Sequence, residues 1–302
     1  MIIVPKNIVT VDSKDRILKN HFIEIENGRI ISIKKNDEKY FLKNKQRVLR
    51  FDDLTLIPGF VQTHIHLCQT LFRGLADDLE LLDWLQLRIF PYENAHNKNS
   101  LLASVRLGLN ELLLGGTTTL LDMGTLRHQE VVFEELQNSG LRAIAGKCLI
   151  DENDLFPQFK SDTKSELEDI YQLAKTFHNT SNGKIKYGFA PRFVLSCSEK
   201  LLKESFEMKK DFTGSLYHTH SSENKDELAE IKRRHKKANI EYFDSIGVVD
   251  DHSVLAHCIH VDEKETELLR KKKIRVAHCP STNLKPGSGI GNIPKNLKKG
   301  IS

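Results

Sequence analysis

Short runs of β-branched and apolar residues dominate the first fifty or so positions, and they predict strands rather than helices. These runs cover residues 2–11, 21–25 and 29–33. The second and third runs are separated by Asn27-Gly28, a dipeptide typical of a two-residue hairpin turn. The pattern therefore predicts an antiparallel β segment that occupies residues 1–55.

From residue 56 onward, strand-like runs alternate with segments of helical periodicity. Strands are predicted at residues 56–65, 117–122, 142–150, 185–190, 214–220, 253–257 and 274–278. Helices are predicted between them at residues 79–89, 100–114, 129–139, 163–177, 199–211, 224–246 and 262–271. Ser100 and Thr163 are the expected N-caps of two helices, and Gly140 is the expected end of another.

Repeated strand–helix units of this kind indicate a parallel sheet with crossover helices, and hence an α/β fold. An open doubly wound sheet usually begins with a glycine-rich phosphate turn, but no G-x-G-x-x-G follows any predicted strand. A (β/α)₈ (TIM) barrel over residues 56–302 fits better, and it places catalytic residues at the C-terminal strand ends. Only seven strands precede Ser302, so the predicted barrel is incomplete.

Composition and charge exclude several classes of protein. The chain has 302 residues, of which 39% are hydrophobic and 28% charged, and no apolar run approaches the roughly 20 residues of a membrane helix. The formal net charge of +4 is too small to indicate a nucleic-acid partner, and the basic run 232–237 reads as a solvated helix face. Five cysteines without C-x-x-C spacing argue against a disulfide framework or a thiolate zinc site. We therefore expect a cytoplasmic protein without membrane contact.

Histidines recur at the ends of the predicted strands. They are His64 and His66 on the first strand, His218 and His220 on the fifth, His257 on the sixth and His278 on the seventh. Because strand side chains alternate with period two, His64 and His66 point the same way and can bind one ion. An isolated H-x-H pair is explained equally well by packing and by metal binding. Buried imidazoles need hydrogen-bond partners or a bound ion, however, so histidines at the ends of several strands favour a site for Zn²⁺ or Fe²⁺.

A carboxylate follows the fifth strand, where Glu223 stands three residues after His220. It can sit beside a metal-activated water and move protons. It can equally be an acidic residue in the first turn of the helix predicted at 224–246. The spacing alone leaves both interpretations open, and the neighbouring histidines favour the catalytic one.

The sequence resembles the amidohydrolase superfamily along essentially its whole length. Within it, the chain looks most like the 5-methylthioadenosine/S-adenosylhomocysteine and 5′-deoxyadenosine deaminases and the related chlorohydrolases. The matching stretches are PGFVQTHIHLCQTLFRGLADDLELLDWLQLRIFPYE, GTTTLLDMG, HTHSSEN, VLAHCIHVDEKE and VAHCPSTNLKPGSGI. The resemblance implies a metal-dependent hydrolase barrel, a composite β-sandwich to which residues 1–55 contribute, and hydrolytic release of ammonia from an aminated purine nucleoside.

The resemblance also implies roles for individual residues. His64, His66 and His220 match the metal ligands, Glu223 matches the proton-shuttling glutamate, and His257 matches the histidine that holds the substrate or its leaving amine. Trp84 and Glu93 match residues that pack on the purine and bind the ribose hydroxyls. Residue type alone would place that tryptophan in the core and that glutamate on the surface. Ser281 and Asn283 fall on the loop that helps to form the pocket mouth.

Two departures from the family pattern bear on the substrate and the metal. Arg192, in APRFVLSC, stands where some adenosine-type deaminases carry a histidine. This stretch also resembles guanine deaminases, whose arginine holds a ring carbonyl, so a guanine deaminase or an s-triazine hydrolase is the alternative function. The fourth strand has Lys184 and Lys186 at its start and none at its end, so the bridging lysine of binuclear members is missing. We therefore expect one divalent ion, Zn²⁺ or alternatively Fe²⁺.

A third departure concerns the end of the barrel. The family's eighth strand carries a metal-binding aspartate in a GTDG or GADG motif, and no such motif occurs before Ser302. The expectation is a C-terminally truncated chain, and the alternative of another class is a catalytically inactive remnant. The expected partner is a small-molecule substrate, and homo-oligomerisation is left open.

Overall fold

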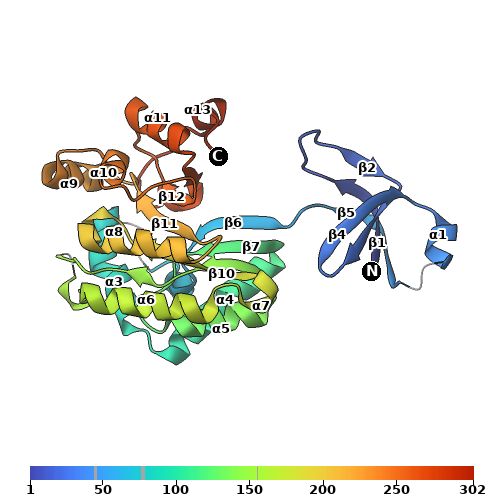
Figure 1. The fold of residues 1–302 in the computed structure, drawn as a ribbon, viewed down its shortest axis with the longest axis horizontal. Helices are drawn as coiled ribbons and strands as arrows, with labels where there is room; N and C mark the ends of the chain where they lie inside the picture. The colour runs from blue at the N-terminus through green and yellow to red at the C-terminus, as the bar shows by residue number, and fades with distance from the viewer. Residues whose placement is uncertain (44–45, 76–78, 155) are drawn as a thin grey trace. The chain divides into compact units, whose positions relative to one another are not determined.

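The computed structural model describes residues 1–43, 46–75, 79–154 and 156–302. The chain divides into two compact units, Met1–Phe60 and Val61–Ser302 (Figure 1). No helix in the described part of the chain is long and apolar enough to cross a membrane.

The first unit is a five-stranded sheet with one short helix. Its elements are β1 (Ile2–Val9), β2 (Ile17–Lys19), β3 (His21–Glu26), β4 (Arg29–Lys35), α1 (Glu38–Lys43) and β5 (Val48–Leu56). The order is β2-β1-β3-β4, and β5 pairs in parallel with β1. Asn27 and Gly28 both have positive φ, 48° and 72°, which is the geometry of a two-residue hairpin turn between β3 and β4. The predicted hairpin is therefore confirmed, but the segment is not antiparallel throughout, because β5 pairs in parallel with β1 and residues 38–43 form a helix.

The second unit contains a sheet that is nearly closed into a barrel, which confirms the predicted fold class. Its strands are β6 (Phe60–Ile65), β7 (Thr117–Asp122), β8 (Arg142–Ala145), β9 (Cys148–Leu149), β10 (Ile185–Pro191), β11 (Leu216–Ser221), β12 (Ser253–His257) and β13 (Arg275–Ala277). The order is β13-β12-β11-β10-β8-β7-β6, with β9 paired to β10. The pairings from β7 to β13 run parallel, so the carboxyl ends of these strands meet at one edge.

Helices connect the strands and cover the sheet (Figure 1). They are η1 (Leu67–Phe72), α2 (Leu81–Trp84), the π-helical η2 (Leu85–Ile89), α3 (Phe90–Ala95), α4 (Lys98–Leu114), α5 (Gln129–Ser139), η3 (Pro157–Phe159), α6 (Thr163–Phe177), α7 (Thr180–Gly183), η4 (Val194–Ser196), α8 (Glu199–Met208), η5 (Lys209–Asp211), α9 (Lys225–His235), α10 (Asn239–Ser245), α11 (Glu263–Lys272), α12 (Pro280–Leu284) and α13 (Ile293–Lys298). Helix α4 packs against β7, α5 against β8 and β10, and α6 and α8 against β10.

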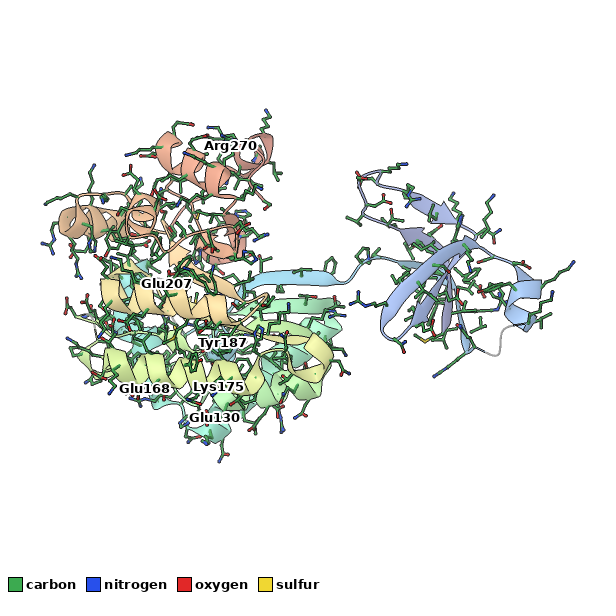
Figure 2. All side chains as sticks on the ribbon, viewed as in Figure 1. Glu130, Glu168, Lys175, Tyr187, Glu207 and Arg270 are labelled. Atoms are coloured by element: carbon green, nitrogen blue, oxygen red, sulfur yellow. The ribbon has the colours of Figure 1, made fainter. Side chains whose placement is uncertain are left out.

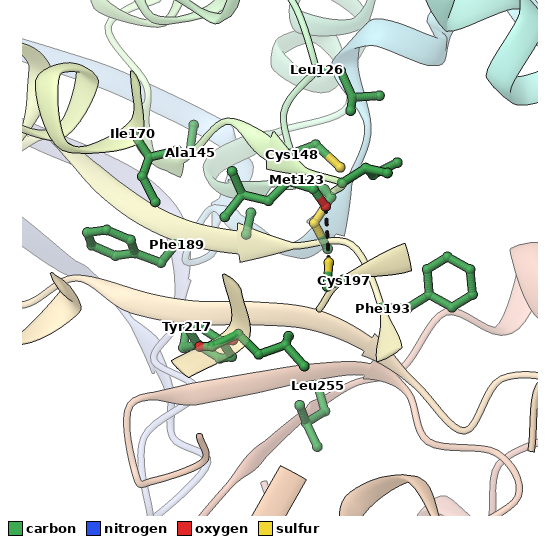
Figure 3. Packing of buried hydrophobic residues seen from close by; sticks show 14 of the residues in the cluster. Met123, Leu126, Ala145, Cys148, Ile170, Phe189, Phe193, Cys197, Tyr217 and Leu255 are labelled. Carbon is green, nitrogen blue, oxygen red and sulfur yellow. Dashed lines mark hydrogen bonds between the residues drawn. The ribbon is translucent and has the colours of Figure 1, made fainter. Parts of the chain in front are cut away.

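The hydrophobic core lies between the parallel sheet and these helices (Figure 3). Phe133 on α5 stacks on Phe177 of α6 with ring centroids 4.6 Å apart, and it also contacts Tyr187 on β10. Tyr187 lies inside the unit, whereas Glu168 and Arg270 project from the outer helices (Figure 2). The apolar side chains pack inside and the charged side chains lie outside, and this packing holds in place the strands whose ends carry the polar residues described below.

Glycines let three neighbouring strands approach closely near those ends. A Cβ added to Gly124 would lie 1.7 Å from the carbonyl oxygen of Gly146, and one added to Gly146 would lie 1.7 Å from that of Gly188. Only glycine fits at Gly124 and Gly146, because the obstructing atoms belong to the backbone.

Several element boundaries differ from the sequence predictions. The strand expected at 56–65 is two strands, β5 and β6, which belong to different sheets on either side of Pro58 and Gly59. The helix expected at 224–246 is divided into α9 and α10 at Lys236, whose φ is 58°. The N-caps are Asn97 and Asp162 rather than Ser100 and Thr163, because their side chains accept the free backbone N–H groups. Gly140 does end α5, with φ of 75°, as predicted.

Candidate metal-dependent active site

A cluster of histidines lies at the carboxyl ends of β6 and β11. Ligand atoms of His64, His66 and His220 all lie within 4.8 Å of one another. The Nε2 atoms of His66 and His220 are only 3.1 Å apart. The structure thus brings together the three residues predicted as metal ligands, although they come from segments far apart in the sequence.

Neighbouring groups fix the orientation of two of these rings. The Nδ1 of His220 lies 2.7 Å from the carbonyl oxygen of Arg192, so this nitrogen donates and Nε2 keeps its lone pair. The Nδ1 of His64 lies 2.8 Å from Nε2 of His218, a hydrogen bond that leaves the His64 Nε2 as its available atom. Anchoring of one ring nitrogen is the usual way in which a protein orients a histidine ligand.

The electrostatic environment keeps the three rings neutral. Burial, with further contributions from the neighbouring charged groups and rings, lowers the pKa of His64, His66 and His220 well below the usual value of histidine. Divalent ions bind neutral imidazole, and three converging imidazoles with free lone pairs form an open metal-binding set. The residues present therefore fit one divalent ion.

A buried carboxyl group stands on the loop that follows β11. Glu223 is 5% exposed, and burial raises its pKa to about 8. Its backbone N–H donates to the carboxylate of Glu227, which also accepts from the side chain of Asn239. Burial, with the adjacent Glu223, raises the pKa of Glu227 to about 7. Glu227 thus fixes the backbone that carries Glu223.

The imidazole of His257, at the end of β12, faces Glu223. Its Nδ1 lies 2.7 Å from Oδ1 of Asn283, and its Nε2 lies 3.3 Å from Oε2 of Glu223. Burial lowers the pKa of His257 while it raises that of Glu223, so the proton between them resides on the carboxyl group. Glu223 and His257 therefore face each other as neutral groups.

Backbone hydrogen bonds join the loops that carry these two groups. The N–H groups of Cys258, Ile259 and His260 donate to the carbonyls of Ser221 and Ser222 over 2.9–3.0 Å. His257 and Cys258 have positive φ, 74° and 46°, which turns the chain after β12 toward the loop after β11.

An ion pair is buried beside the histidines. The guanidinium of Arg192, at the end of β10, contacts the Glu93 carboxylate on α3 over 2.8 Å and 3.3 Å, and both residues are under 5% exposed. Gln69 donates to the same carboxylate over 2.7 Å, and Arg192 lies 4.9 Å from the ring centroid of Phe90. Although burial opposes it, the Glu93 carboxylate raises the pKa of Arg192. The hydrogen bonds thus hold two charged side chains, Arg192 and Glu93, in fixed positions next to His66.

Breaking this pair should destabilise the fold. We expect Glu93→Gln to lower the free energy of unfolding by about 3–5 kcal/mol, because it leaves a buried guanidinium without its counter-charge. The measurement is urea denaturation followed by circular dichroism. Glu111→Gln is the matched control, because Glu111 pairs with Arg73 on the surface and its loss should change little. Equal destabilisation by both variants would contradict the role assigned to burial.

Asp122, at the end of β7, is a second buried carboxyl group, and it contacts the chain just after β6. Its Oδ1 accepts the backbone N–H of Leu67 over 2.9 Å, whereas its Oδ2 is buried without a hydrogen-bond partner. Burial raises the pKa of Asp122 to about 7. Asp122 therefore holds the chain directly after His66.

Asp122 gives the stability of the protein a defined pH dependence. Its folded-state pKa lies above its unfolded value, so folding retains a proton and the associated stability is lost as pH rises from about 4 to about 7. Between pH 5 and pH 8 we expect the wild type to lose about 2–3 kcal/mol more stability than Asp122→Asn. Denaturant titrations of both proteins at the two pH values test this. Parallel pH profiles would show that Asp122 is not the responsible group.

Two other residues predicted to contribute to the site differ in how far they are buried. Trp84, on α2, is half-buried and packs against the barrel core, while Ser281 is exposed on α12. The structure adds groups that sequence analysis did not place in the site, namely Asp122, Glu227, Gln69 and Cys279. His218, one of the strand-end histidines named from the sequence, contacts His64, whereas the four added groups have no distinctive sequence pattern.

Comparison with known proteins gives the chain clear relatives. Residues 55–302 match the amidohydrolase family. A 5-methylthioadenosine/S-adenosylhomocysteine deaminase from Bacillus cytotoxicus is 32% identical, over 99% of this chain and 67% of the relative. A 5′-deoxyadenosine deaminase from Methanothermobacter thermautotrophicus is 34% identical, over 82% of this chain and 56% of the relative.

A solved structure shares the whole fold. The crystal structure of a guanine deaminase from C. acetobutylicum, with guanine bound in its active site, aligns with a TM-score of 0.91 at 28% identity. The alignment covers 100% of this chain and 72% of that protein.

Proposed function

The chain belongs to the amidohydrolase family, a family of metal-dependent hydrolases, and from that membership we propose that it deaminates an aminated purine nucleoside. The substrate class is that of 5-methylthioadenosine, S-adenosylhomocysteine and 5′-deoxyadenosine. One observation carries the proposal: three neutral imidazoles converge beside a buried carboxyl group whose pKa lies near neutrality. This is the combination that activation of water and protonation of a leaving amine require.

His64, His66 and His220 are the proposed ligands of a single ion, which we propose to be Zn²⁺ because imidazole nitrogen suits it, with Fe²⁺ as the alternative. A divalent ion held there supplies the acidity that turns water into a nucleophile near neutral pH. The hydrogen bonds from His220 to Arg192 and between His64 and His218 hold two of these rings in place without substrate.

Glu223 is the proposed proton carrier. Hydrolytic deamination consumes one water, breaks the bond between the ring carbon and the amino group, and releases one ammonia. A group with a pKa of about 8 is present in both protonation states near neutral pH, so its ionised form can take a proton from the attacking water and return it to the leaving amine. His257, fixed by Asn283, faces the same carboxyl group and is the proposed contact for the attacked centre.

A guanine deaminase is the second candidate, and the buried pair of Arg192 and Glu93 favours it. Both oxygens of Glu93 already accept hydrogen bonds from Arg192, and one also accepts from Gln69, so ribose binding by Glu93 must compete with these contacts. A planar guanidinium fixed at the site is instead suited to a ring carbonyl. Two further alternatives, an s-triazine hydrolase and a catalytically inactive protein, are possible outcomes of the assay described next.

One assay separates these candidates. The protein loaded with Zn²⁺ is incubated with 5-methylthioadenosine, S-adenosylhomocysteine, 5′-deoxyadenosine, guanine and an amino-s-triazine, and ammonia release is measured. The proposal predicts fastest turnover of a nucleoside. Preference for guanine would replace it by the second candidate, and absence of turnover on every compound would contradict both.

A further inference from the structure

A thiol that the proposed reaction does not use faces the histidine cluster. Cys279 follows β13 directly, and its sulfur lies within 4.8 Å of ligand nitrogens of both His64 and His257, as those nitrogens do of each other. Its described hydrogen bond is a weak one to the carbonyl of Ala277, at 3.5 Å. Burial raises the pKa of Cys279 to about 11, so the free thiol is a poor nucleophile at neutral pH.

The other groups around this thiol have suitable lone pairs. Asn283 binds Nδ1 of His257, which leaves Nε2 free, and Glu223 Oε2 lies 3.3 Å from that nitrogen. In tetrahedral sites with these donors, ligand atoms stand roughly 3.3–3.8 Å apart. If the ligand atoms of His64, His257 and Cys279 moved about an ångström closer together, two imidazoles and a thiolate would surround one ion. The Glu223 carboxyl group would lie next to that ion.

We infer that His64, His257 and Cys279 form a second metal site, distinct from the set His64, His66 and His220, which takes a soft divalent ion such as Cd²⁺ or Zn²⁺ in excess. A thiolate combined with imidazoles selects such ions over Mg²⁺ or Ca²⁺. Binding of the ion displaces the proton of the Cys279 thiol into solvent, and no oxidation is involved.

The two sites compete because they share His64. Its Nδ1 is hydrogen-bonded to His218, so only Nε2 is available, and one nitrogen lone pair binds one ion. An ion in the second site also occupies His257 and lies next to Glu223. The inference does not depend on the identity of the substrate, and its first consequence is a metal-binding property that can be measured without turnover.

Cadmium reports on the thiolate directly. Titration of the chelator-treated protein with Cd²⁺ should produce the ultraviolet charge-transfer absorption of a cadmium thiolate, saturating at one ion per chain. Cys279→Ser and Cys279→Ala should each abolish the absorption while circular dichroism shows an intact fold. Cys68→Ser is the matched control, because Cys68 groups with His66 and Glu93 in the same way but Glu93 is held by Arg192. It should retain the absorption.

Competition is tested by loading the protein with one equivalent of Zn²⁺ before the titration. The Cd²⁺ concentration needed for half-maximal absorption should then rise at least about tenfold, since one shared ligand must be released. An unchanged concentration would overturn the sharing of His64. Retention of the absorption in either folded Cys279 variant, or its loss in Cys68→Ser alone, would overturn the site itself.

Discussion

We expect Glu223→Gln to lower ammonia release by about 10²–10⁴-fold, the size of a lost acid–base contribution, and to leave one bound metal ion per chain. The amide has nearly the same shape, so it fills the space beside His257, but it cannot take up and return a proton. The measurement pairs a turnover assay on the preferred substrate with metal analysis of the purified variant.

The control for this variant is Asp226→Asn, which likewise replaces a carboxyl group by an amide, at an exposed position three residues further along the chain. It should leave turnover and metal content unchanged. If Glu223→Gln instead loses its ion and keeps full activity per remaining ion, Glu223 is a ligand rather than a proton carrier.

We expect His66→Ala to abolish stoichiometric metal binding. Its Nε2 lies 3.1 Å from that of His220, and removal of this ring leaves two imidazoles from the proposed set, one fewer than the three protein ligands of an open catalytic site. Metal content per chain after gel filtration is the measurement. His21→Ala, in the first unit, should retain the ion. Unchanged content in His66→Ala would contradict the assigned ligand set.

Elements whose ends are marked by local chemistry agree with the sequence analysis. The strands at 117–122 and 253–257 and the helices at 129–139 and 163–177 have the predicted bounds. Gly140 marks the end of α5 because a left-handed residue there favours glycine. Such signals lie within a few residues of the feature that they determine.

Boundaries set by distant contacts could not be predicted in this way. β5 pairs with β1, from Ile2 opposite Val48 to Ile8 opposite Leu56, and nothing local to residues 48–56 assigns them to that sheet. Lys236 adopts a left-handed conformation within a run of good helix formers, so composition predicts a continuous helix across it.

The same distinction applies to the site. The convergence of His64, His66 and His220 follows from period-two spacing and from parallel strands that end at one edge. The contact between Glu93 and Arg192 joins residues 99 positions apart, and no periodic pattern links them. The resemblance relates these two residues to different parts of a substrate, whereas in the structure they bind each other.

The backbone hydrogen bonds between the loops after β11 and β12 bear on how such a protein can diversify. Because the donors and acceptors are peptide groups, the backbone contact between the two loops does not depend on which side chains residues 221, 222 and 258–260 carry. Substitutions at these five positions can therefore change the side chains while the backbone contact between the loops that carry Glu223 and His257 is kept.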